Sequence, residues 1–301
     1  MNGLLLWNLM RETWSALTQH FEPIIETIVV DSGLDVRTWG LLLAVLTFEP
    51  DHTTPAHLMV RGPYTAAESY LARLEAAAEM GYLSEVAEGE FYLTPAGRAE
   101  TQRFIERARH AMVAVLPAPG DSVIKLAHYL DQLVRSCLNT QPPPDIWSIR
   151  LSHRLMPPID SPLPFIEQSF SCLAAYRDDA HLAAWQASGL TATAMEALTF
   201  IWRAQVDSLD GLVEHLAQRG HHRQVYVDAV SELRKRIFVT SAQGRLHITK
   251  TGQHFRDQVE SDTDQYFYKP WFIMNELDSK ELHHLLLKLK DGLRRKKING
   301  S

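Results

Sequence analysis

The sequence predicts a mainly α-helical fold with two small β-hairpins, because one pattern of apolar and turn positions occurs twice. Residues 83–97 (LSEVAEGEFYLTPAG) align without a gap on residues 238–252 (FVTSAQGRLHITKTG), 155 positions later. Identical pairs in this register include Gly89 and Gly244, Thr94 and Thr249, and Gly97 and Gly252. The register extends back to Thr38 on Thr193, so the pattern covers about 65 residues and predicts two similar modules.

The first copy has the elements of a small helical module with a hairpin. Residues 36–48 place apolar side chains at helical spacing, and Thr54-Pro55 is a typical start for a short helix over 55–60. Residues 64–80 form a longer helix that ends at Gly81. Residues 82–83 and 90–93 are short strands around Glu88-Gly89, and a last helix covers 98–116.

The second copy repeats this order. We expect helices at 193–202, 209–218 and 221–236, with a turn at Gly220, then a hairpin over 238–249 and a helix over 252–266. Helix, short helix, turn, longer helix, hairpin and helix is the order of a winged helix-turn-helix. The expected architecture is therefore two winged-helix modules in tandem, joined by a helical, proline-rich middle segment.

Motifs in the first copy resemble those of MarR-like winged-helix transcription regulators. They are Tyr70-Leu71-Ala72-Arg73-Leu74-Glu75, Met80-Gly81-Tyr82-Leu83 and Phe91-Tyr92-Leu93-Thr94-Pro95-Ala96-Gly97. The resemblance implies a recognition helix, a wing and a Leu-Thr-x-x-Gly return. MarR-like proteins act as dimers through long terminal helices. Here one chain carries both modules, so we expect the helices at 4–20 and 278–296 to help form a shared body.

Three domains are expected from this organisation. They are residues 1–116, with the first module, residues 117–189, the middle segment, and residues 190–301, with the second module. Nine of the fifteen prolines lie between Pro117 and Pro164, which leaves room for helices at 122–138 and 164–186. An apolar stripe predicts that the C-terminal helix docks on the body: Leu282, Leu285, Leu286, Leu289 and Leu293.

Charge separates the two copies at the positions that would face a duplex. Residues 64–95 carry one basic and six acidic side chains, whereas residues 219–250 carry seven basic and two acidic ones. In MarR-like proteins the long helix enters the major groove and the wing meets phosphate, so basic and neutral polar side chains are needed there. We therefore expect the second copy to bind double-stranded DNA. The expected contact residues are Arg219, His221, His222, Arg223, Gln224, Tyr226 and Arg245.

The middle segment contains histidines and acidic residues that could serve an enzyme as metal ligands or catalytic groups. Residues 176–185, followed by Gly189-Leu190, resemble a family of helix-turn-helix proteins with DinB-like helical regions, and DinB-like proteins often hold a metal with three histidines. His128, His153 and His181 lie here, but no HxxxH or HExxH spacing places two of them together. Asp178-Asp179 offers an acid/base pair or a polar helix surface. We expect no metal, no cofactor and no catalytic residue.

Composition sets the remaining expectations. The chain has 301 residues, 46% hydrophobic residues and a net charge of −6, so any DNA contact must come from a local patch. Cys137 and Cys172 give no disulfide framework, and no apolar run reaches the ~18 residues of a membrane-spanning helix. We expect a soluble, cytoplasmic, DNA-binding transcription regulator without a membrane partner.

Several alternatives stay open at this level. A protein-interaction scaffold that has lost DNA binding is the first, and a DinB-like metal-dependent enzyme is the second. A small-molecule effector is a further expected partner, because aromatic residues of the middle region would line a cleft or form a core. These residues are Trp147, Phe165, Phe170, Tyr176, Trp185 and Trp202.

Overall fold

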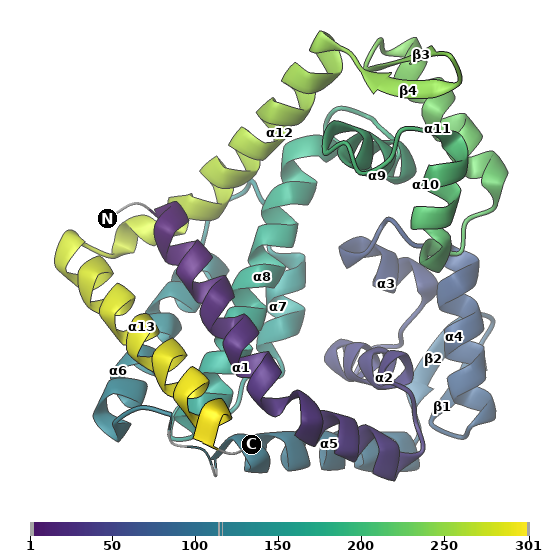
Figure 1. Ribbon diagram of the computed structural model, residues 1–301. Coiled ribbons are helices and arrows are strands. Elements are labelled where there is room, and N and C mark those ends of the chain that lie inside the picture. The colour runs from purple at the N-terminus through teal and green to yellow at the C-terminus, as the bar shows by residue number, and fades with distance from the viewer. Residues whose placement is uncertain (1–2, 114, 116, 300–301) are drawn as a thin grey trace.

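The computed structural model describes residues 3–113, 115 and 117–299, with side chains described up to residue 294. The chain is mainly α-helical, with two small two-stranded antiparallel sheets that form the predicted wings. Its helices are arranged as a ring around a central opening (Figure 1).

The same order of elements occurs in both halves of the chain. The first half contains α1 (Gly3–Ser32), α2 (Val36–Phe48), α3 (Pro55–Arg61), α4 (Ala67–Glu79), β1 (Leu83–Ala87), β2 (Glu90–Leu93), α5 (Pro95–Val113) and α6 (Gly120–Leu138). The second contains α8 (Pro162–Gln186), α9 (Ala192–Trp202), α10 (Leu209–His215), the 3-10 turn η1 (Ala217–Arg219), α11 (Arg223–Lys235), β3 (Val239–Ala242), β4 (Arg245–Ile248), α12 (Lys250–Tyr268), the 3-10 turn η2 (Lys269–Ile273) and α13 (Glu276–Asn299). The helix α7 (Trp147–His153) lies between the halves.

Side-chain caps fix where the helices of each module begin. Asp35 accepts hydrogen bonds from the Arg37 and Thr38 N–H groups at the start of α2. Thr191 does the same for the Ala194 N–H at the start of α9. Such caps satisfy N–H groups that have no partner inside the helix, so the start residues of both modules are specified locally.

The Thr-x-x-Gly motif has the same geometry in both halves. Thr249 Oγ1 donates to the Ile237 carbonyl, 2.6 Å away, and accepts from the Gly252 N–H at 3.0 Å. Thr94 makes the equivalent bonds to the Gly81 carbonyl and the Gly97 N–H. A Cβ on Gly252 would overlap with the Phe238 carbonyl. Glycine is required here because the last helix of the module crosses the backbone of its hairpin at close range.

The two halves exchange their terminal helices in a shared body. α1 of the first half packs along α13 of the second, and α8 of the second half packs along α6 of the first. One hydrophobic core joins all four helices. It includes Met10, Leu130 and Leu173, each fully buried, and the expected stripe from Leu282 to Leu293. The packing of the N-terminal and C-terminal helices in one body agrees with the expectation from the sequence.

Each module has its own core at one end of a long helix. The first module packs around Trp39, Leu42 and Phe91 and receives Val29 from the end of α1. The second packs around Met195 and Leu233 and receives residues from the end of α8. Long helices therefore connect the body to both modules, which lie next to each other on the side of the opening away from the body (Figure 1).

Helix α7 was missing from the sequence prediction. The N–H groups of Ser148 and Ile149 donate to the buried Asp179 carboxylate at 2.8 and 3.0 Å. Burial raises the pKa of Asp179 to about 6. Asp179 is therefore the cap of a helix that is distant in the sequence. α1 also extends beyond the expected residues 4–20, because Ile28 and Val29 are buried against the first module.

The central aromatic residues are largely core residues. Phe165, Phe170, Tyr176 and Trp185 are each at most 4% exposed. Trp147 is 41% exposed and lies at the start of α7. Within the described part of the chain, none of the helices is both long and apolar enough to cross a membrane.

A glycine substitution tests the close crossing of α12 and the hairpin. Gly252→Ala should lower the stability of the protein by about 1–3 kcal/mol, because the new methyl group overlaps with backbone that cannot move independently. Gly40→Ala is the matched control, since no atom lies within 4 Å of a Cβ at this position in α2. It should be neutral or stabilising. Urea unfolding followed by circular dichroism measures both, and equal midpoints would contradict this geometry.

Candidate nucleic-acid interface

Helix α11 presents one face to solvent and the opposite face to the core. Tyr226, Ala229, Val230 and Leu233 are buried at helical spacing. The exposed side chains of α11 are Arg223, Gln224, Asp228, Arg234 and Lys235. They share the other face, which we call the α11 face. It is the face that a recognition helix of this motif presents to the major groove.

The β3–β4 wing adds basic side chains beside this face. Its two-residue loop, Gln243-Gly244, has positive φ angles of 51° and 78°, as in the tight hairpin turn that favours Asn or Gly. Arg245 is 70% exposed and pairs with Asp207 at 3.1 Å. Lys250, at the start of α12, is also exposed. Exposed cations on a wing are the groups that contact phosphate in winged-helix complexes.

The predicted contact residues do not all lie on this surface. His222, Arg223 and Gln224 are exposed at the start of α11. Arg223 forms an ion pair with Asp210, and Gln224 donates to Asp228 at 3.0 Å. Tyr226, in contrast, is 1% exposed and its hydroxyl donates to the Leu216 carbonyl at 3.3 Å. The expectation of a DNA contact by Tyr226 disagrees with its burial.

Arg219 and His221 contact the protein itself. Arg219 donates to Glu196 Oε1 through two nitrogens, at 2.9 and 2.6 Å, and lies over the Tyr64 ring. His221 Nε2 lies 3.0 Å from the Tyr64 carbonyl. In this conformation both residues contact Tyr64 of the first module and so help to hold the two modules together. Arg236 likewise donates to the Ser188 and Gly189 carbonyls at the end of α8.

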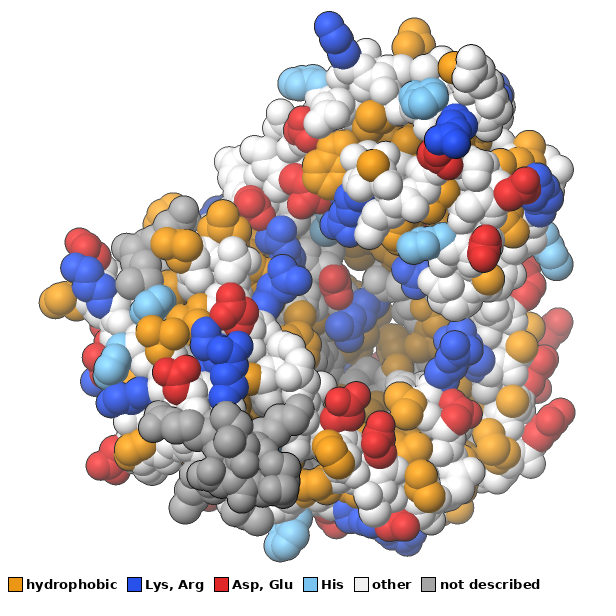
Figure 2. Space-filling view, in the orientation of Figure 1, with side chains coloured by type: hydrophobic (Ala, Val, Ile, Leu, Met, Phe, Trp, Pro, Cys, Tyr) orange, Lys and Arg blue, Asp and Glu red, His pale blue; other side chains and the backbone are white. Residues whose placement is uncertain are grey.

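The equivalent surface of the first module is acidic. On α4 the exposed side chains include Glu68, Glu75 and Glu79. The β1–β2 wing adds Glu85, Glu88 and Glu90, of which Glu85 accepts from the Gly89 N–H at 2.8 Å. Figure 2 shows acidic side chains along the edge of the molecule where α4 and this wing lie. Carboxylates at these positions repel phosphate, so the charge difference expected from the sequence lies on the surface.

The two modules meet where the first turn of α4 lies against the turn before α11. The Ala66 N–H donates to the Arg219 carbonyl at 2.9 Å, and Gly220 lies against Ser69 so closely that a Cβ there would overlap with its hydroxyl. We call this contact the junction. Tyr64 and Arg219 both lie in the segment just before the long helix of their module, so corresponding regions of the two halves touch each other.

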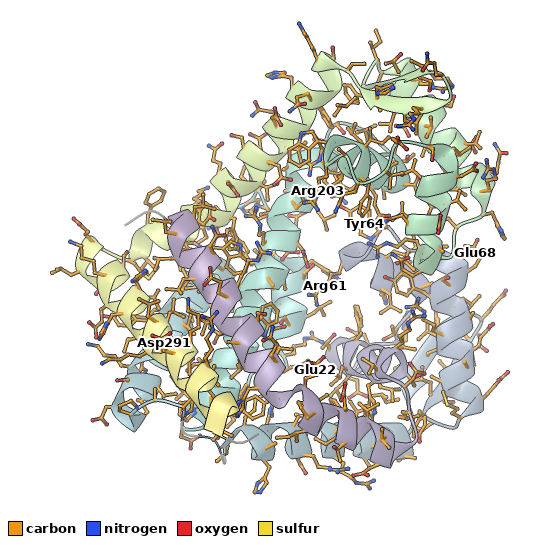
Figure 3. All side chains as sticks on the ribbon, in the orientation of Figure 1. Glu22, Arg61, Tyr64, Glu68, Arg203 and Asp291 are labelled. Atoms are coloured by element: carbon orange, nitrogen blue, oxygen red, sulfur yellow. The ribbon has the colours of Figure 1, made fainter. Side chains whose placement is uncertain are left out.

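The junction extends into the core of the second module. The Tyr64 ring packs near Trp185, with ring centroids 6.3 Å apart, and burial raises the pKa of Tyr64 to about 12. Arg61 pairs with Asp178 of α8 at 3.6 Å. Figure 3 labels Arg61 and Tyr64 where α3 faces α8 and α9. The junction was not predicted from the sequence, because each of these residues is ordinary in its own local pattern.

The ring encloses an opening of about 1180 Å³ between the body and the junction. Its apolar wall comes from α1, α2 and α5 and includes Phe21, Leu41 and Met112. Its polar wall is a stripe along α8 that includes Gln168, Ser171, Asp178 and His181. Figure 2 shows the hollow with hydrophobic, basic and acidic side chains inside it. Pockets that bind small molecules combine apolar walls with a few polar groups in this way.

The three histidines of the middle segment lie in different surroundings. His128 is exposed on α6, and His153 ends α7. His181 Nδ1 lies 3.3 Å from the Thr263 hydroxyl, and burial lowers its pKa to about 4. Among the described residues, no group of three or more His, Cys, Asp or Glu side chains is arranged to hold a metal ion. Cys137 and Cys172 are both buried.

These features define a helix-turn-helix protein with wings. Residues 150–298, about half of the chain, match the model of a family described as Helix-turn-helix family. The match covers the second module together with α8 and most of α13, and double-stranded DNA is the partner that such a motif suggests. No curated protein and no solved structure matched the chain.

A substitution at Arg219 separates a structural role from a DNA-binding role. Arg219→Ala should lower stability by about 1–3 kcal/mol, because Glu196, which is 7% exposed, loses both hydrogen bonds. Arg245→Ala is the control and should change stability by less than about 0.5 kcal/mol, since its partner is exposed. Thermal unfolding measures both. Equal midpoints would show that the Arg219–Glu196 pair does not support the fold.

Proposed function

We propose that this protein is a cytoplasmic DNA-binding transcription regulator without catalytic activity. The second module contacts the duplex with the α11 face and the β3–β4 wing. The observation that carries the proposal is the charge of this surface: Arg234, Lys235, Arg245 and Lys250 are exposed on one module, whereas the equivalent surface of the other is acidic. The Thr-x-x-Gly return supports a MarR-like winged helix.

Electrostatics favours binding by one module. The chain has a net charge of −6, so it has no general attraction for nucleic acid. A local basic surface then decides where phosphate binds, because each neutralised phosphate releases bound cations. Among the seven basic residues of 219–250, Arg219 and Arg236 are held by protein groups and leave five at the surface.

A protein partner is the second candidate function, and the acidic α4 surface favours it. Glu68, Glu75 and Glu79 lie on exposed turns of one helix, which suits a basic protein surface. Such a scaffold needs no DNA contact. The two functions differ in one simple observation, which is whether the wild-type protein binds duplex DNA at low ionic strength.

Fluorescence anisotropy with labelled duplex DNA tests the DNA-binding proposal. The double substitution Arg234→Ala and Lys235→Ala should weaken binding and reduce the slope of log affinity against log salt by about 2, at roughly 0.9 for each lost phosphate contact. Neither side chain is buried, so folding should be unaffected.

The matched control is Glu79→Ala, at the last residue of α4, which corresponds to Lys235 at the end of α11. It should leave the affinity unchanged or slightly raise it. Equal affinity of the double variant and the wild type would overturn the assignment of the DNA surface. Absence of binding by the wild type at low salt would favour the scaffold.

The regulator also responds to an effector in the central opening, and the supporting observation is the mixed wall of this cavity. Its volume of about 1180 Å³ suits an amphipathic molecule whose apolar part faces α1 and α2 and whose polar part faces Arg61 and α8. Gly40 lines the cavity and has open space around it.

A filling substitution tests this cavity. Anilinonaphthalene sulfonate, an aromatic anion with an apolar body, should bind the native protein saturably with increased fluorescence. Gly40→Trp should reduce this binding at least several-fold because the indole occupies the opening, whereas Gly120→Trp, at an exposed helix start, should not. Binding that is unaffected by Gly40→Trp would place the probe elsewhere and count against the effector site.

A further inference from the structure

The junction joins the two helix ends that a helix-turn-helix protein needs for reading bases. In this motif the N-terminal residues of the recognition helix reach deepest into the major groove. Here the turn before α11 is occupied by the first module, through the Ala66 N–H on the Arg219 carbonyl and the Gly220–Ser69 contact. α4 and α11 therefore meet with their N-termini together.

This arrangement conflicts with deep entry of α11 into a groove. The major groove is about 12 Å wide, close to the ~10–12 Å diameter of one helix with its side chains. Helix α4 and the α3–α4 corner lie directly at the end of α11, so they would meet the walls of the groove. The closed ring also cannot read two half-sites of a duplex at once. Recognition helices that read two half-sites are about 34 Å apart, whereas the N-terminal ends of α4 and α11 are in contact here.

We infer that the junction is an autoinhibitory contact that keeps the second module from reading bases until the modules separate. The inference rests on the proposed function. In the closed ring, the exposed Arg234, Lys235 and Arg245 still reach phosphate, which gives weak binding independent of sequence. Separation of the modules frees the turn at Gly220 and the His221 side chain for the duplex, whereas Arg219 keeps its ion pair with Glu196 of the same module.

The contacts of the junction are of the kind that can break without unfolding either module. Its polar contacts include the Ala66–Arg219 backbone hydrogen bond, the contact of His221 with the Tyr64 carbonyl, the Arg219 guanidinium over the Tyr64 ring and the exposed Arg61–Asp178 pair. Arg61 and Asp178 have exposed fractions of 45% and 54%, so this pair contributes little. The inserted Tyr64 side chain is the largest part of the contact, since it packs on the core of the second module.

Gly220→Ala opens the junction by steric overlap, because the new Cβ would overlap with the Ser69 hydroxyl. The matched control is the double variant Gly220→Ala and Ser69→Gly, which removes the overlapping side chain. Both variants carry the same backbone cost at Gly220, whose φ is +75°, so they differ in the overlap. Tyr64→Ala opens the junction independently, and Tyr64→Phe keeps its ring.

The experiment measures affinity for duplex DNA of random sequence, together with the distance between fluorophores at Glu68→Cys and Gln218→Cys, which are exposed beside the junction. The native Cys137 and Cys172 are buried, so the labels are selective. Gly220→Ala and Tyr64→Ala should lengthen the distance and bind DNA about tenfold more tightly, a typical size for coupling between two sites. The double variant and Tyr64→Phe should resemble the wild type.

Each other outcome has a distinct meaning. Variants that open but bind DNA no more tightly than the wild type would overturn the autoinhibitory role and leave the proposed function standing. Variants that stay closed would overturn the steric basis of the inference. No DNA binding by any variant, open or closed, would overturn the proposed function itself.

Discussion

The structure depends on the exchange of terminal helices between the two halves of the chain. Because α1 packs along α13 and α6 along α8, neither half can complete the shared core without the other. The buried face of each helix therefore fixes the position of the module at its end. This constraint brings the first turn of α4 into contact with the turn before α11, closes the ring and creates the opening inside it.

Local features of the fold could be predicted from the sequence, and non-local ones could not. Glycines at turns, the caps and the Thr-x-x-Gly return act over a few residues, so the pattern at 83–97 and 238–252 was sufficient to predict both hairpins. Helix α7 was missed because its N-terminus is capped by Asp179, which lies 31 positions from Ser148. The surrounding prolines also hide the helical period of this segment.

The candidate DNA surface could also be predicted only in part, because some of its residues have partners that are distant in the sequence. Counting charges over residues 219–250 identified the module with the more basic surface but treated all basic residues alike. Arg219 and Arg236 are held by Glu196 and by backbone carbonyls, contacts that only the tertiary structure brings together. Tyr226 has the spacing of a core residue, since it lies on one helical face with Ala229 and Leu233. A periodicity check would have assigned it to the core.

The similar geometry of the two modules contrasts with their different surfaces. A symmetric pair of recognition helices suits a palindromic site, but here only one of them carries a surface that attracts phosphate. The closed ring restricts both long helices, because it occupies the N-terminal ends of α4 and α11 and leaves the outward face of α11 available. We therefore propose that the protein binds DNA with its second module alone and that the first module restrains this binding.

The most direct test of this account is the distance between nitroxide labels at Glu68→Cys and Gln218→Cys, measured by pulsed electron paramagnetic resonance without and with duplex DNA. The account predicts one short, narrow distance for the free protein, since the Ala66 nitrogen and the Arg219 oxygen lie 2.9 Å apart. It predicts a longer distance when DNA is bound. A broad or long distance in the free protein, or a short distance that DNA leaves unchanged, would contradict it.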